Sequence, residues 1–297
     1  MSRTARLLFL LLLSLGAATL LANGGLMAFP VSGQPQSATV KSISASAAHV
    51  PFNQGEVETE RQLLALANES RRKAGVPALN LDSGLSQAAR VHAESMLEAR
   101  QLSHQFQGEP PLPQRLASSS RLLLDQAGEN VAFDYDAQHG HEHLMLSPPH
   151  RANLLNPAYN VVGLGVVRNG DRLYIVQDFG HALPNYSAEE VKERVALAVQ
   201  HRRHQSKRSR LSRKDLSNAD QAACSMAQAD RLGTSPVRNL AERYTVLTYS
   251  SVHPETLPRQ AWHAISSHTL RSFSVGACYA RTETYPSGAY WVVLSLE

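Results

Sequence analysis

One run of thirteen residues, at 144–156, constrains the fold of this chain more than any other segment. It reads LMLSPPHRANLLN, with an apolar stretch, a proline pair, one histidine and then an Arg-Ala-Asn turn. Proline lacks an amide donor and restricts the residue before it, so we expect a helix over 136–147 to stop at Pro148. The run therefore predicts that His150 lies where the chain leaves a helix.

Further motifs flank this run in order: LSH at 102–104, AGENVA at 127–132, VGLG at 162–165 and YIVQDFG at 174–180. Taken together, over about 56–180, they resemble a bacterial CAP domain. That superfamily contains cysteine-rich secretory proteins, antigen 5 and plant pathogenesis-related proteins, and is also called SCP-like. The resemblance implies a CAP-type α-β-α sandwich with an antiparallel sheet.

Local sequence patterns independently predict an α+β fold. Apolar residues recur at helical spacing over 56–73, and Ser83 can cap a second helix. Two apolar segments, 160–167 and 172–179, flank an Asn-Gly turn, which is the strongest short-range signal for a β-hairpin. Helices followed by antiparallel strands indicate layers of helices against a sheet.

The beginning of the sequence predicts export. Arg3 and Arg6 precede an apolar stretch, Leu7 to Ala22, as in a secretory signal or a retained anchor. We expect a signal peptide or N-terminal anchor at 1–28 and a flexible linker at 29–53. The protein is then secreted or held in the cell envelope or periplasm.

The remainder divides into a CAP/SCP-like domain at 54–184, a basic helical linker at 185–214 and a small C-terminal α+β domain at 215–297. Residues 223–232 match 93–102 at half of the ten positions, which favours a degenerate CAP-like copy over an unrelated fold. A gapless alignment sets Glu242 against Glu129 and His263 against His150.

Cysteine and charge add two expectations. An exported chain with two cysteines favours a disulfide, here between Cys224 and Cys278. The net charge of +4 is concentrated within 192–214, which predicts contact with an anionic surface, or simply a solvated helix end. No specific nucleic-acid partner is expected.

The CAP resemblance implies a central cleft lined by two histidines and two glutamates. His104 matches the first histidine, Glu129 the first glutamate and His150 the second histidine. The second glutamate would fall at Pro148 or Pro149 and is absent. His141 lies seven residues before Pro148 on the same helical face, so it is our candidate for that place.

Two imidazoles can bind zinc or another divalent cation through neutral nitrogens, which makes His104 and His150 the metal candidates. Glu129 is then a ligand or the candidate base of a hydrolytic reaction. The alternative is a hydrogen-bonded polar core, because buried polar groups need partners whatever their purpose. We expect no other cofactor.

The sequence therefore predicts an exported CAP/SCP-domain protein that acts as a non-catalytic ligand-binding or interaction module rather than as an enzyme. Its partner would be an extracytoplasmic lipid, cell-wall polymer or protein. One alternative is a metal-dependent hydrolase of peptides or envelope polymers. Another is an envelope-structural protein with a vestigial cleft.

Overall fold

The computed structural model describes residues 53–297, so the predicted signal or anchor segment and nearly all of the predicted linker lie outside the described residues. Two four-stranded sheets are formed, one in each half of the described chain. Within this part of the chain, no helix is both long and apolar enough to cross a bilayer.

The first half contains one mixed sheet with the strand order β1-β3-β4-β2. Strands β3 and β4 form the predicted antiparallel hairpin, and its turn contains Gly170 at φ 63°. Only the short β1 runs parallel to its neighbour β3. The elements are α1 (Gln54–Ala74), β1 (Asn80–Leu81), α2 (Ser83–Ala99), α3 (Leu112–Ser119), β2 (Leu123–Asp134), α4 (Ala137–Leu146), α5 (Pro148–Leu154), β3 (Val161–Asn169) and β4 (Arg172–Leu183).

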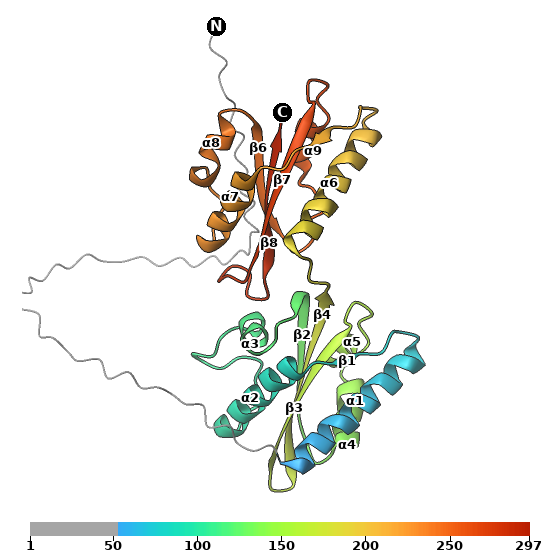
Figure 1. The fold of residues 1–297 in the computed structure, drawn as a ribbon. Coiled ribbons are helices and arrows are strands. Elements are labelled where there is room, and N and C mark those ends of the chain that lie inside the picture. The colour runs from blue at the N-terminus through green and yellow to red at the C-terminus, as the bar shows by residue number, and fades with distance from the viewer. Residues whose placement is uncertain (1–52) are drawn as a thin grey trace, which may run out of the picture. The chain divides into compact units, whose positions relative to one another are not determined.

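Helices cover both faces of this sheet, as the α-β-α prediction requires (Figure 1). On one face, Val162, Leu164 and Val166 of β3 pack in a core with residues of α1 and α4. On the other face, β3 presents Gly163 and Gly165 to α2, where an added Cβ would lie 2.1 or 2.2 Å from the helix backbone. The glycines of the VGLG motif therefore allow α2 to approach the sheet closely.

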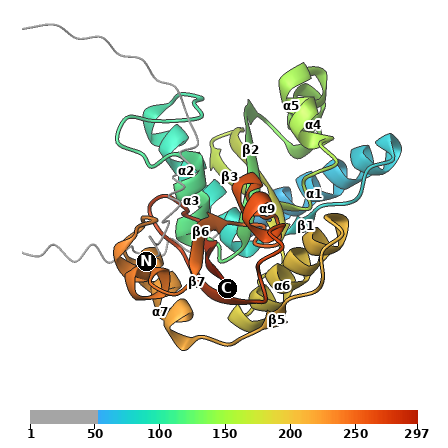
Figure 2. The same ribbon diagram turned by 90° about the horizontal axis from the view of Figure 1, so that it is seen from above.

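The second half repeats this topology, with the strand order β5-β7-β8-β6 and a parallel pair at β5–β7. Helices α6 and α7 lie on opposite sides of its sheet (Figure 2). The α+β prediction for this part of the chain is confirmed. Its elements are α6 (Ala188–Gln205), β5 (Ser212–Arg213), α7 (Ser217–Gln228), the 3-10 helix η1 (Ser235–Val237), α8 (Arg238–Ala241), β6 (Thr245–Ser251), α9 (Arg259–Ile265), β7 (Ser272–Ala280) and β8 (Ala289–Leu296).

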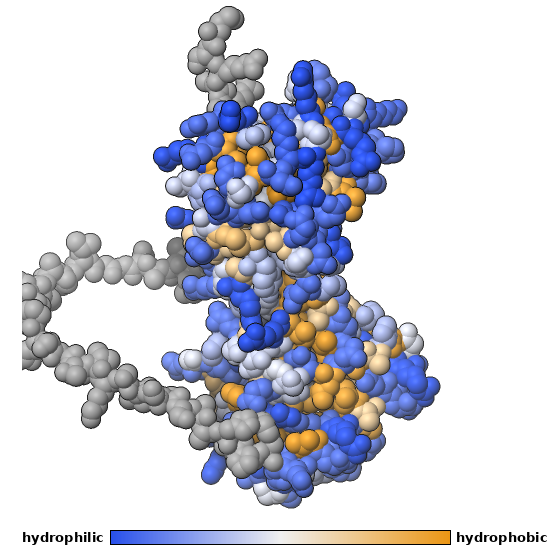
Figure 3. Space-filling view, in the orientation of Figure 1, coloured by the Kyte–Doolittle hydropathy of each residue, from blue (hydrophilic) through white to orange (hydrophobic). Residues whose placement is uncertain are grey.

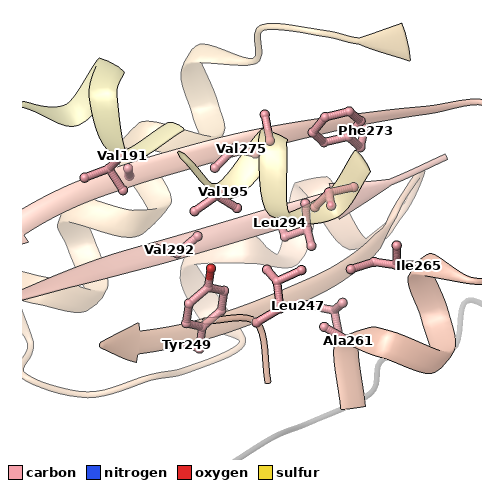
Figure 4. Packing of buried hydrophobic residues seen from close by; sticks show 14 of the residues in the cluster. Val191, Val195, Leu247, Tyr249, Ala261, Ile265, Phe273, Val275, Val292 and Leu294 are labelled. Atoms are coloured by element: carbon pink, nitrogen blue, oxygen red, sulfur yellow. The ribbon is translucent and has the colours of Figure 1, made fainter. Parts of the chain in front are cut away.

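The predicted basic linker at 185–214 is built into the second half. Val191, Val195 and Val199 of α6 are fully buried and pack with Phe273 and Val275 of β7 (Figure 4). Valines four residues apart form a stripe along one side of a helix, and that stripe is buried against the sheet. The position of α6 in the order of elements corresponds to that of α1 in the first half.

A buried arginine occupies equivalent positions in the two halves. Arg71 of α1 donates through Nε to the carbonyl of Pro77 at 2.6 Å and through Nη1 to that of Leu154 at 2.9 Å. Arg203 of α6 donates through Nε to the carbonyl of Ser209 and through Nη1 to that of Ile265, both at 2.9 Å. Leu154 and Ile265 end α5 and α9, so each arginine ties the first helix of its half to the later short helix.

The predicted disulfide is formed between Cys224 of α7 and Cys278 of β7. It joins a helix to the sheet that this helix covers. Closing a loop with a sequence separation of 54 residues stabilises the fold by about 4 kcal/mol in the chain-entropy model.

Candidate functional site

Three of the four predicted cleft residues gather at the edge of the first sheet. Glu129 lies in β2, the edge strand, and His104 lies in the loop after α2. The Nδ1 atom of His104 is 2.8 Å from Oε1 of Glu129. His150 lies in α5, and the charge of the His104 ring lowers the pKa of His150 in addition to the larger effect of burial. We call these three residues the His-Glu cluster.

Local hydrogen bonds fix His150 against β2. Asn130 of β2 donates through its side chain to the main-chain carbonyl of His150 at 3.1 Å. Asn153, one turn further along α5, donates to the carbonyl of Glu129 at 3.1 Å. The asparagines of the GEN and HRAN motifs thus connect α5 to the strand that carries Glu129.

A buried arginine occupies the other oxygen of Glu129. Arg115 of α3 donates through Nη2 to Oε2 of Glu129 at 2.9 Å and to the carbonyl of His104 at 3.1 Å. Only 7% of Arg115 and 8% of Glu129 are exposed. Both carboxylate oxygens of Glu129 therefore already face hydrogen-bonding groups.

A second layer of polar groups supports this arrangement. His92 of α2 is fully buried, with Nδ1 2.7 Å from Oε1 of Glu109 and Nε2 2.8 Å from the carbonyl of Ser103. Glu109 also lies 3.5 Å from Nη1 of Arg115. Because Ser103 precedes His104, the network holds the loop that carries the first histidine of the cluster.

Asp178 of β4 adds a further carboxyl group beside Glu129, on the neighbouring strand. The two residues are cross-strand partners, and Asp178 has no solvent exposure. Burial, and then the charge of Glu129, raise the pKa of Asp178 well above its usual range. Burial therefore favours the protonated, uncharged form of the Asp178 carboxyl group.

His141 lies apart from the cluster. Its Nε2 is 2.8 Å from the hydroxyl of Ser70, so its polar contact is with α1. Burial lowers the pKa of His141. The position of the missing second glutamate is taken by Pro148, which begins α5, and no described contact brings His141 toward His104 or Glu129.

The sequence did not single out Arg115 or Glu109, which have no recognisable motif. His92 stands in no motif either, and its buried ring contacts residues of the network around the cluster. Asp178 stands in the YIVQDFG motif, directly after the buried Gln177, which is the one sequence signal for a second carboxyl group.

The residues present do not fit a usual zinc site. Among residues 53–297, no group of three or more His, Cys, Asp or Glu side chains is placed to hold a metal ion. Catalytic zinc sites use three protein ligands, whereas Glu129 is already engaged by Arg115 and only the imidazoles of His104 and His150 remain. The cluster offers two imidazoles, of which His104 has a side chain that is 59% exposed.

The second half does not keep the cluster, and the gapless alignment of Glu242 and His263 is corrected by the structure. When the two sheets are matched by their β-ladders, Val246 occupies the position equivalent to Glu129. When the short helices α5 and α9 are matched, Ala261 occupies the position equivalent to His150. Ala261 is 2% exposed and lies in the apolar core of its half (Figure 4). The aligned stretch of α2 and α7 is supported, because Gly165 meets Ala89 as Gly276 meets Ala219.

Comparisons with known proteins agree with this fold. Residues 64–179 match the model of the cysteine-rich secretory protein family, CAP. The uncharacterised membrane protein YlbC of Bacillus subtilis (strain 168) is 35% identical over 125 residues, which are 42% of this chain and 35% of that protein. The uncharacterised protein YkwD of the same strain is 31% identical over 115 residues, 37% of this chain and 43% of that protein.

The chain thus spans less than half of the length of these two relatives. Among solved structures, an extracellular protein containing an SCP domain from Bacillus anthracis str. Ames is 25% identical. The match covers 44% of this chain and 45% of the solved chain, with a TM-score of 0.40. The family match contains His104, Glu129 and His150. Over residues 64–179, the chain is thus similar to the CAP family of cysteine-rich secretory proteins.

Proposed function

We propose that this protein is exported and that its first half is a non-catalytic binding module, with the His-Glu cluster as its recognition site. The observation that carries the proposal is the position of Arg115, whose guanidinium holds the second oxygen of Glu129 at 2.9 Å. Export rests on the N-terminal sequence and on the extracellular solved protein that the domain resembles.

A general base must contact the proton that it removes, directly or through one water molecule. In this cluster Oε1 of Glu129 faces the ring of His104 and Oε2 faces Arg115. A glutamate in that position orients its neighbours rather than receiving a proton from water. The arrangement therefore favours binding over hydrolysis.

The same contact orients His104. When Nδ1 carries the proton and donates it to Glu129, the lone pair of Nε2 is left for a ligand. His150 is neutral at neutral pH, because burial lowers its pKa. The free Nε2 of His104 and the ring of His150 suit hydrogen bonds to a hydroxyl, amide or lipid headgroup. A cell-wall polymer, a protein or a lipid is therefore the partner class that we propose.

The alternative is a metal-dependent hydrolase in which His104 and His150 bind the metal and Glu129 is the base. That function requires Glu129 to leave Arg115. Incubating the protein with purified peptidoglycan sacculi and with a peptide mixture, with Zn²⁺ added, distinguishes the two proposals. Co-sedimentation measures binding and mass spectrometry measures released products.

We expect His150→Ala to weaken binding to one of these probes by at least tenfold, with no products in any sample. His143→Ala is the matched control, because His143 is an exposed histidine of α4 that lies outside the cluster. Zinc-dependent products from the wild type that disappear in His150→Ala, with folding unchanged, would establish the hydrolase instead. Equal binding by all three proteins would remove the cluster from recognition.

A further inference from the structure

Two segments that are distant in sequence form one surface at the C-terminal end of α6. The hydroxyls of Ser206 and Ser266 are 2.8 Å apart, and Nε of Arg208 donates to the carbonyl of Ser266 at 3.0 Å. The amide of Ser212 donates to the carbonyl of Arg271 at 3.0 Å. The loop after α6 and the loop before β7 therefore lie side by side.

Four exposed cations on these loops have no carboxylate partner within residues 53–297: Lys207, Arg208, Arg210 and Arg271. We call these four residues the basic surface. Neighbouring cations behave differently, since Arg213 pairs with Glu189 and Glu193, and Lys214 pairs with Glu297. The two neighbouring loops thus bring together four cations that have no counter-charge in the described part of the chain.

Helix stability explains only part of the positive charge in this region. Cations in the last turn of a helix are favoured by its dipole, which accounts for Arg202 and His204, and Arg203 is a buried clamp. Lys207 and Arg210 follow the end of α6, and Arg271 lies on the other loop. No helix terminus or hydrogen bond within the described residues accounts for their side chains.

Exposed apolar side chains flank the basic surface. Trp262 of α9 is 40% exposed, and the guanidinium of Arg202 lies 4.7 Å from its ring centroid. Leu197 of α6 is 58% exposed and lines, with Arg210 and Phe273, a hollow of about 270 Å³. Elsewhere on the second half, in the view of Figure 3, hydrophobic areas are interspersed among hydrophilic residues.

We propose that the basic surface, with Trp262 and Leu197, binds the surface of a membrane that contains anionic phospholipids. Phosphate headgroups supply the missing counter-charges, and each cation near such a surface adds to the attraction. Tryptophan is enriched at the interface between lipid and water, and a leucine beside an arginine can enter the boundary of headgroups and acyl chains. A soluble polyanion would leave these apolar side chains without a role.

The chain outside the described residues supports the choice of a membrane. Its sequence predicts a signal or anchor at 1–28, and about 25 residues separate that segment from α1. A retained anchor would hold the chain at the bilayer.

The test measures partitioning of residues 53–297 onto vesicles by co-sedimentation, after circular dichroism has verified cooperative unfolding of each variant. Vesicles contain phosphatidylcholine alone or with 30% phosphatidylglycerol as probe compositions. The test variant is Lys207→Glu/Arg210→Glu/Arg271→Glu. The control, Arg100→Glu/Arg121→Glu/Arg238→Glu, has the same net charge and changes exposed arginines that form no ion pair within residues 53–297.

We expect the wild type and the control to bind the anionic vesicles within twofold of each other and the test variant to bind at least tenfold less. Trp262→Ala should weaken binding by about threefold or more at 0.5 M NaCl, where electrostatic attraction is screened. Equal loss in both triple variants would reduce the effect to net charge and overturn the proposal. Equal binding to both vesicle types, or tenfold preference for polyphosphate in competition, would also overturn it.

Discussion

Replacing Arg203 by methionine tests whether a buried arginine holds the second half together. The guanidinium donates to the carbonyls of Ser209, Ile265 and Ser267, and the residue is 2% exposed. Hydrogen bonds from a charged donor contribute about 1.5–3 kcal/mol each. Some of the freed carbonyls can reach water, so we expect a loss of about 3–5 kcal/mol in the free energy of unfolding. That is a large part of the 5–15 kcal/mol of a typical domain.

Urea denaturation followed by tryptophan fluorescence measures this loss. Both tryptophans of the chain, Trp262 and Trp291, lie in the second half, so the signal reports on its unfolding. Arg202→Met is the matched control, because Arg202 stacks on Trp262, a contact worth about 0.5–1 kcal/mol. A loss below 1 kcal/mol in Arg203→Met, or equal losses in both variants, would refute the reasoning.

Three further predictions concern the described fold. Cys224→Ala/Cys278→Ala should lose about 4 kcal/mol, measured by denaturation of the second half, and an unchanged midpoint would contradict the entropic estimate. Gly276→Ala should lose about 3 kcal/mol in the free energy of unfolding or fail to fold, because the added Cβ would lie 2.2 Å from a backbone carbon of α7. In the control, Gly233→Ala, the added Cβ meets its nearest atom at 4.0 Å, so we expect a loss of less than about 1 kcal/mol. Burial lowers the pKa of His141 below its unfolded value of about 6.5, so its stabilising effect is complete above that pH and declines as the pH falls toward the folded pKa. The wild type should therefore lose more stability between pH 7 and pH 5 than His141→Gln, and equal slopes would contradict this assignment.

The fold of the first half could be predicted because its signals are local. Helical periodicity, the Asn-Gly turn and the proline pair each act within a few residues, and they mark α1, the β3–β4 hairpin and the end of α4. The proline pair has a second effect that the sequence prediction missed. Pro148 ends α4, but it also begins α5, because the first turn of a helix tolerates proline.

The candidate site could be predicted only in part. His104, Glu129 and His150 stand in motifs, whereas Arg115 reaches Glu129 because of the path taken by the loop between α2 and α3. No local pattern encodes that path. His141 satisfied the helical spacing, but α4 turns this face toward α1 and Ser70.

The second half shows why a gapless alignment fails where elements have been lost. One helix, α9, stands between β6 and β7, where the first half has both α4 and α5. Because one helix is missing, equivalent residues before and after that point differ by unequal numbers, and a single gapless offset cannot match both. Glu242 and His263 therefore fall beside the equivalent positions, and the true counterparts, Val246 and Ala261, are apolar.

The central claim is that Arg115 engages Glu129 and leaves the His-Glu cluster a binding site instead of a metal centre. Zn²⁺ titration calorimetry on residues 53–297 tests it most directly, with the wild type, Arg115→Gln and His104→Ala/His150→Ala. We predict no stoichiometric binding to the wild type, and tighter binding to Arg115→Gln, where Glu129 is free to become a third ligand. Stoichiometric, micromolar or tighter binding to the wild type that the double histidine variant abolishes would contradict the account.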